Sequence, residues 1–160
     1  MDAAFLDDFR RTVDRAAERL LAVSDADAGR SPAPGKWSKK EIIGHLIDSA
    51  ANNHGRFVRA QQQEDLVFPG YDQDAWVRLQ RYQERSWQDL VELWLAYNHH
   101  IALVMESADL QALARPRALH NLHELAWHPV PRSEPVTLEY FMRDYVAHLK
   151  HHLRQAMPAT

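Results

Sequence analysis

Apolar side chains recur at helical spacing in four segments of the chain. In residues 2–23 the spacing of i, i+4 and i+8 gives one apolar face, and charged residues cover the other side. The segments from Ser38 to about residue 62, from Ser86 onwards, and from Thr137 to about Ala156 show the same pattern, so each predicts an amphipathic helix. The inward-facing lines are Phe5, Phe9, Val13, Ala16 and Leu20; Ile42, Leu46, Ala50, Asn53 and Phe57; Trp87, Leu90, Val91, Trp94, Asn98, Ile101 and Met105; and, in the last segment, Phe141 and Tyr145.

Residues that begin or interrupt helices stand at the ends of these segments. Ser38 and Glu41 form a capping box, in which the serine side chain caps the backbone N–H at Glu41 and the glutamate reaches back. Thr137 can cap the last helix, and Glu139 in its first turn is favoured by the helix dipole. The stretch from Ser24 to Trp37 contains two glycines and two prolines and predicts a loop.

The two remaining connections differ in character. Residues 65–85 begin with a turn at 68–72 and then predict a short helix from about Gln73 to Gln80, packed across the other helices. Ala108–Pro135 contains four prolines and no helical period, which predicts a long, partly ordered crossover with short extended pieces at 117–119 and 125–128. Four amphipathic helices with one long crossover predict an all-α four-helix bundle.

Length and composition narrow the class of protein. A chain of 160 residues, 46% apolar and 26% charged, predicts one soluble globular domain over residues 1–160. A net charge of −3 argues against a nucleic-acid partner, and no run approaches the roughly 18 apolar residues that cross a membrane. The acidic N-terminus lacks the basic start and apolar run of a signal peptide, so we expect a cytoplasmic protein. The chain has no cysteine, so nitrogen and oxygen atoms must hold any metal, and any reactive thiol must come from outside.

The strongest candidate for chemistry is a pair of histidines in the last helix. His148 and His152 are separated by one turn and point the same way, along the flank of the line formed by Phe141 and Tyr145. Two imidazoles at i, i+4 on an inward face can chelate a metal, although packing histidines with satisfied polar atoms fit the same spacing equally well. His151 is rotated away from this pair, towards Asp144 and Lys150.

A polar strip borders the apolar line of the second helix and consists of His45, Ser49, Asn52 and Arg56. Such a strip indicates either the rim of a wet internal cavity or a boundary between core and solvent. Since sites in bundles are built from facing helices, His45 could meet the pair on the last helix. His54 lies about half a turn away around the same axis and cannot serve the same site.

The sequence leaves the roles of the other polar residues open. Asn98 lies within the inward line of the third helix and needs a hydrogen-bond partner, which is either a ligand or bound water in a site or a residue of a neighbouring helix. His99 and His100 should face outward. The crossover contains three further histidines without an assigned role, His120, His123 and His128.

Two motifs, Gly35–Asp48 and Pro135–Leu153, resemble the DinB-like superfamily in its YfiT-like branch of metal-dependent hydrolases and thiol S-transferases. The resemblance extends over essentially the whole chain. It implies an up-down-down-up four-helix bundle that is often dimeric and that holds a divalent metal, Zn²⁺ or Ni²⁺, through three histidines. By position these ligands are His45, His148 and His152. Characterised branches join bacillithiol, mycothiol or glutathione to an electrophile, others are thiol-dependent isomerases, and many members are described only as metal-dependent hydrolases.

The chemistry of three imidazoles is compatible with this resemblance. Such a site leaves an open metal position, where a bound thiol or water would lose its proton near neutral pH. Asp144 could orient His148, and Asp48 could orient His45, although a solvated helix carboxylate is the more common role. Arg56 could bind an anionic thiol or substrate, or be a surface cation.

The sequence and the resemblance therefore predict a metal-dependent enzyme that acts on a small molecule, and the leading hypothesis is a thiol S-transferase. The alternatives are a metal-dependent hydrolase and a non-catalytic stress-response or binding bundle with a structural metal. A homodimer is expected from the resemblance and from outward apolar residues of the third helix, Leu95, Leu103 and Val104.

Overall fold

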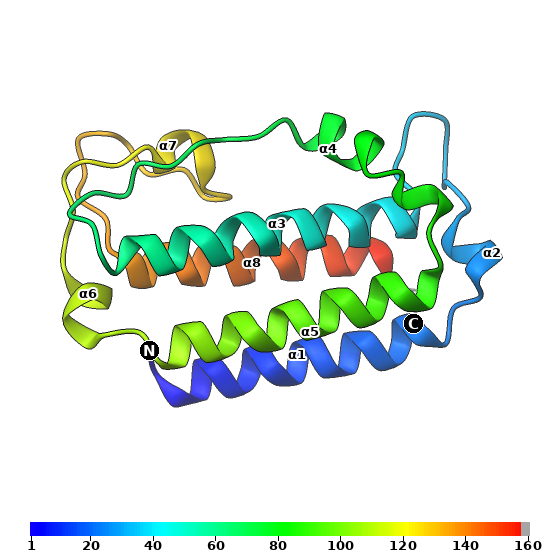
Figure 1. The fold of residues 1–160 in the computed structure, drawn as a ribbon, viewed down its shortest axis with the longest axis horizontal. Coiled ribbons are helices and arrows are strands. Elements are labelled where there is room, and N and C mark those ends of the chain that lie inside the picture. The colour runs from blue at the N-terminus through cyan, green and yellow to red at the C-terminus, as the bar shows by residue number, and fades with distance from the viewer. Residues whose placement is uncertain (158–160) are drawn as a thin grey trace.

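The computed structural model describes residues 1–157, which form helices and two isolated β-bridges but no β-strand (Figure 1). Four long helices make the bundle: α1 (Ala3–Leu21), α3 (Lys39–Ala60), α5 (Trp87–Glu106) and α8 (Leu138–Ala156). Five short elements lie in the connections: α2 (Asp25–Ala28), α4 (Gln73–Leu79), η1 (Tyr82–Glu84), α6 (Leu110–Ala114) and α7 (Leu122–Leu125).

The four long helices follow an up-down-down-up order. In Figure 1, α1 and α8 run in one direction, and α3 and α5 run in the other. Helix α3 packs against both α5 and α8, and α1 packs against α5. The fold class predicted from the sequence is confirmed.

The predicted inward faces form the core. Every residue of the four lines is buried except Phe5, which is partly buried beneath the guanidinium of Arg143 at 4.4 Å. Trp94, Phe9 and Phe57 are among the largest fully buried side chains. Their burial supplies much of the hydrophobic free energy that holds the helices together.

The predicted caps are present. Ser38 Oγ accepts from the N–H of Glu41 at 3.2 Å, and Glu41 accepts from the N–H of Ser38 at 2.8 Å. Thr137 Oγ1 accepts from the N–H of Tyr140. These bonds fix where α3 and α8 begin, and so the positions of all later residues on each helix.

The crossover is more ordered than predicted, because it contains α6 and α7. The expected extended piece at 117–119 is reduced to an isolated antiparallel bridge between Arg117 and Val136, and 125–128 begins with the last residue of α7. A second bridge joins Leu66 to His120. The connection containing α4 and the part of the crossover containing α7 lie on the α3 side of the bundle, away from α1 and α5, whereas α6 lies at one end of the bundle (Figure 1).

Helices long and apolar enough to cross a membrane are absent from the part of the chain that the structure describes.

Candidate metal centre

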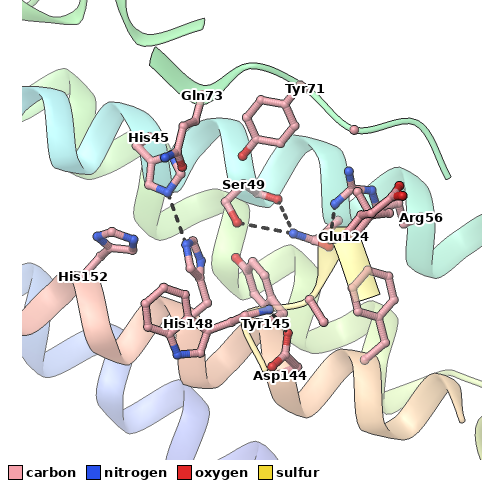
Figure 2. Close-up of a pocket in the computed structure, with 16 residues that line it drawn as sticks. His45, Ser49, Arg56, Tyr71, Gln73, Glu124, Asp144, Tyr145, His148 and His152 are labelled. Atoms are coloured by element: carbon pink, nitrogen blue, oxygen red, sulfur yellow. Dashed lines mark hydrogen bonds between the residues drawn. The ribbon is translucent and has the colours of Figure 1, made fainter. Parts of the chain in front are cut away.

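Three histidines from two helices converge at one point. His45 lies in α3, and His148 and His152 lie one turn apart in α8 (Figure 2). One ring nitrogen of each can be chosen so that the three lie within 4.8 Å of one another. The Nε2 atoms of His45 and His148 are 3.2 Å apart. This is close to the roughly 3.3 Å between two nitrogens that each lie about 2.0–2.1 Å from one tetrahedral ion.

The surroundings favour the neutral form of these rings. Burial, and then the nearby His152, lower the pKa of His45 to about 4. Burial followed by the neighbouring histidines lowers the pKa of His148 to about 3, and burial also lowers that of His152. A neutral imidazole is the form that offers a lone pair to a metal, so all three rings are ready to bind one near pH 7.

Hydrogen bonding at the cluster also fits a metal. Gln155 Oε1 lies 3.0 Å from His152 Nδ1 and can only accept, so that nitrogen carries the proton and Nε2 keeps its lone pair. His45 Nδ1 is buried without a hydrogen-bond partner, which leaves the ring supported only through Nε2 and its aromatic contacts. Three imidazole nitrogens without thiolate or carboxylate suit a divalent transition metal such as zinc, nickel, copper or iron.

His151 does not join the cluster. Its ring lies against Trp127, with centroids 4.5 Å apart, and its Nε2 is 3.1 Å from the Gln155 amide nitrogen. Its ring touches that of His152, with centroids 5.1 Å apart, but it is not one of the three converging histidines, and it lies towards Trp127 and Gln155 rather than Asp144 and Lys150.

A cavity of about 440 Å³ opens beside the three histidines. Its volume is within the range of small-molecule sites. Helix α3 lines it with His45, Ser49, Asn53 and Arg56, and α8 with Phe141, Asp144, Tyr145, His148 and His152; the connections supply Gly70, Tyr71, Gln73, Glu124, Leu125, Ala126 and Trp127. The polar strip of α3 is thus the wall of a cavity. Asn53 takes the place predicted for Asn52, because the cavity lies on the side of the strip that faces α8, and Asn52 instead bonds the backbone of Asp48.

The expectation that Asp144 orients His148 is wrong, and so is the alternative of a solvated carboxylate. Asp144 is buried and accepts from the backbone N–H groups of Trp127 and His128 at 2.7 and 2.8 Å. His128 Nδ1 also lies 2.9 Å from it. Asp144 therefore fastens the crossover to α8, so that Trp127 forms a wall beside His148 and His152.

Asp48 likewise does not orient His45. It is buried and accepts from the Tyr82 hydroxyl at 2.6 Å and from the Gln80 amide. Burial raises the pKa of this carboxyl. Its role is to hold the connection after α4 against α3.

Asn98 has the structural role expected for it. Its Oδ1 accepts from the Tyr145 hydroxyl at 2.6 Å and its Nδ2 donates to the Trp94 carbonyl at 2.8 Å. The pair joins α5 to α8 behind the cavity. Asn98 is therefore not a ligand-binding residue.

Arg56 is not a surface cation, since only 5% of it is exposed. It lines the cavity at the end far from the histidines (Figure 2).

The remaining histidines lie outside the cluster. His54 and His100 face each other with Nε2 atoms 3.3 Å apart, and His99 contacts Asp14 at 2.7 Å. His99 and His100 are exposed, as predicted. In the crossover, His120 bonds the Glu134 carbonyl, His123 contacts Glu124, and His128 contacts Asp144.

Several site residues were not identified from the sequence. Trp37 lies over His45 with ring centroids 5.1 Å apart, and it directly precedes the capping serine, which was the available signal. Gln155 lies one residue before the end of α8, three residues after His152, a spacing that could have revealed it. Tyr71, Gln73 and Trp127 belong to connections, for which helical phase gives no information.

Comparison with known proteins gives concordant results. Residues 8–156 match the sequence profile of the DinB superfamily. A protein of Oceanobacillus iheyensis named "Putative metal-dependent hydrolase" is 26% identical over 62 residues, which cover 39% of this chain and only 36% of that protein.

Two solved structures share the fold. YfiT from Bacillus subtilis, described as "a probable metal-dependent hydrolase with an unusual four-helix bundle topology", has a TM-score of 0.73 and 20% identity over 98% of this chain and 86% of its own. The mycothiol-dependent maleylpyruvate isomerase has a TM-score of 0.70 and 12% identity over the whole of this chain and 63% of its own.

Proposed function

This chain belongs to the DinB superfamily, and we propose that it is a metal-dependent enzyme that joins a low-molecular-weight thiol to an electrophile. The observation that carries the proposal is the convergence of His45, His148 and His152, all favoured in the neutral form, on the wall of a small-molecule cavity.

Each part of the site has a definite task in this proposal. His45, His148 and His152 would hold a divalent metal, zinc or nickel, whose Lewis acidity would lower the pKa of a bound thiol or water towards neutrality. Gln155 holds His152 in the tautomer that presents Nε2. Trp37 lies against the ring of His45, and Trp127 lies against the rings of His148 and His152.

The names of similar proteins support the two halves of the proposal separately. The Oceanobacillus protein and YfiT are both described as metal-dependent hydrolases, and the isomerase is described as mycothiol-dependent. Since this chain has no cysteine, a thiol reaction would require a thiol from outside. Hydrolysis by an activated water is the second candidate, because the same three histidines would serve it.

The cavity favours an enzyme over a non-catalytic bundle. A structural metal is closed in by four protein ligands, whereas the cluster contains three histidines and borders open space.

The test is a conjugation assay on untagged protein, stripped of metal and then reconstituted with zinc or nickel. Bacillithiol, mycothiol, glutathione and cysteine are each offered with monochlorobimane. We expect at least one thiol to react faster with the metal-loaded protein than with the metal-free protein or with His148→Ala. Metal-dependent ester or amide hydrolysis without conjugation would favour the hydrolase, and neither activity would favour the binding protein.

A further inference from the structure

Arg56 is a buried cation without an anionic partner. Its Nη2 donates to the Pro69 carbonyl at 2.8 Å and its Nη1 contacts Asn53 Oδ1 at 3.4 Å. Both partners are neutral, and among residues 1–157 no carboxylate lies within ion-pair distance of it. Burying an uncompensated guanidinium is costly, so a retained one indicates a site for an anion.

The carboxylates that share the cavity are already engaged. Asp144 accepts two backbone N–H groups, and Glu124 is exposed and paired with Arg132 at 3.3 Å. The single positive charge of Arg56 therefore remains available to a molecule that enters the cavity. One guanidinium, with two carboxylates on the same walls, favours a singly charged carboxylate over a phosphate dianion.

We propose that the compound bound in the cavity carries a carboxylate that pairs with Arg56, while its reacting atom lies at the three histidines. The inference rests on the proposed function, since it takes the histidine cluster as the reacting end. His45 and Arg56 are eleven residues apart on α3, or about 16 Å along the axis. Because both side chains reach into the cavity, the carboxylate and the reacting atom should be on the order of 10 Å apart.

The walls between the two ends suit such a molecule. Asn53 donates to the Ser49 carbonyl at 2.9 Å and lies 3.3 Å from Ser49 Oγ, giving a polar wall on α3. Phe141 and Tyr145 give a largely apolar wall on α8. Tyr71 lines the same space, and burial raises its pKa to about 12, so its hydroxyl keeps its proton at neutral pH.

A binding experiment tests the anion site without any turnover. Acetate and succinate, with neutral acetamide as the reference, are titrated into the metal-loaded protein, and affinity is read from amide and arginine side-chain NMR shifts. We expect the carboxylates to bind and acetamide not to bind. Arg56→Met should weaken carboxylate binding by roughly 10- to 100-fold, the range for a hydrogen bond to a charged group.

Arg59→Met is the matched control, since Arg59 lies one turn further on α3 and is exposed. It should leave carboxylate affinity within about twofold. If the methionine variant does not fold, Arg56→Gln replaces it, because the glutamine amide can still donate to the Pro69 carbonyl. It should weaken carboxylate binding by the same factor. Carboxylate affinity that is unchanged in both Arg56 variants would overturn the proposal. This is also the result expected if the carboxylate binds only the metal.

The kinetic experiment identifies which co-substrate carries the carboxylate. As the thiol, 8-mercaptooctanoate is compared with its methyl ester, and as the electrophile, a carboxylate-bearing maleimide is compared with its methyl ester. Arg56→Met should raise KM about tenfold or more for the charged member of one pair, with less change in kcat and little change for its neutral member. Equal effects on all four compounds would assign Arg56 a structural role.

The two proposals fail separately. Carboxylate binding that depends on Arg56, without conjugation by any thiol, would keep the anion site and reject the transferase. Conjugation that is indifferent to Arg56 would keep the transferase and reject the anion site.

Discussion

The side-chain amide of Gln155 contacts two neighbouring histidines, His151 and His152, of which only His152 belongs to the cluster. Its oxygen accepts from His152 Nδ1, and its nitrogen lies 3.1 Å from His151 Nε2. The first contact leaves His152 Nε2 free to face the cluster, whereas His151 contacts both Gln155 and Trp127. Adjacent histidines of α8 thus differ in role because they diverge by about 100° around the helix.

This difference predicts the metal content of single variants. His45→Ala, His148→Ala and His152→Ala should each lose most of the bound metal, because two imidazoles hold an ion far less tightly than three. His151→Ala should keep it, and so should His54→Ala, whose ring contacts His100 instead. Metal per chain by elemental analysis, beside thermal melts with and without metal, makes the comparison. An empty site in His151→Ala with a full one in His152→Ala would show that the ligand assignment is wrong.

The pKa shifts predict that the metal-free protein loses stability on acidification. The unfolded chain takes up protons on these histidines near pH 6.5, whereas folded His45 and His148 do so only near pH 4 and 3. The unfolded state therefore binds more protons between these values, and stability falls as pH falls through this window. From about pH 7.5 to pH 5 each ring should contribute a loss of up to roughly 2 kcal/mol.

Urea unfolding of metal-free protein at a series of pH values measures this loss. His148→Gln should show a shallower fall than the native chain, since one titrating ring is gone. His99→Ala, at an exposed position, should follow the native curve. A native curve that is flat between pH 7.5 and 5 would mean that the rings titrate normally.

At the residue scale, the sequence could place the histidines but not their supports. The phase of His148 and His152 depends only on local helix geometry. Asp144 and Asp48 were misassigned because their partners lie 16 to 34 residues away, in connections whose course depends on tertiary packing. Arg56 was left open between two roles for the same reason.

Among the elements, α3 depends on one position where a side chain cannot fit. A Cβ at Gly44 would lie 2.1 Å from Cδ2 of Tyr82, the residue whose hydroxyl bonds Asp48. Gly44 therefore lets the Tyr82 ring lie flat on α3, one residue from the histidine cluster. Glycine inside a helix lowers the stability of the helix by about 1 kcal/mol relative to alanine. The close contact with Tyr82 explains why glycine is nevertheless found at this position.

Gly44→Ala should accordingly destabilise the protein by roughly 1–3 kcal/mol despite its better helix propensity, because the Tyr82 ring must move. Gly55→Ala is the matched control on the same helix. Its Cβ would meet only the flexible end of Arg59 at 3.4 Å, so it should stabilise by about 0.4–1 kcal/mol. Chemical unfolding of both variants at equal metal content gives the comparison. Stabilisation by Gly44→Ala would show that Tyr82 is not held against α3.

The bundle helices could be predicted from the sequence, while the connections could not. Caps and apolar periods are local signals, and α3 ends only two residues before the predicted boundary. Helices α6 and α7 have five and four residues, too few to show a period. Their course depends on distant bonds, such as those of Asp144 to the backbone of Trp127 and His128.

At the scale of the whole molecule, the bundle helices and the connections contribute different parts of the candidate site. Helices α3 and α8 provide the histidines and Arg56, and the connections that cross them provide Tyr71 and Trp127. The histidine cluster therefore lies on the rigid helices, whereas the cavity is shaped by segments that can vary in sequence without disturbing the core.

We propose that a homodimer forms through the outward side of α5, with one correction to the residues expected there. Leu95 and Val104 are partly buried against the core, so they offer less free surface than predicted. Leu103 is 54% exposed, and Leu93, ten residues earlier and about 80° away around the helix, is 48% exposed. Exposed leucines on the outward side of a helix favour a contact with a second copy.

Light scattering at micromolar concentration should therefore give the mass of two chains, and Leu103→Glu should shift it towards one chain by placing a charge in the apolar contact. Leu119→Glu, at a 64% exposed position in the crossover, is the matched control and should remain dimeric. Metal content should be the same in both variants, because the three histidines come from a single chain. A native protein with the mass of one chain would contradict the prediction. A Leu103→Glu variant that stays dimeric would show that the interface does not involve this face of α5.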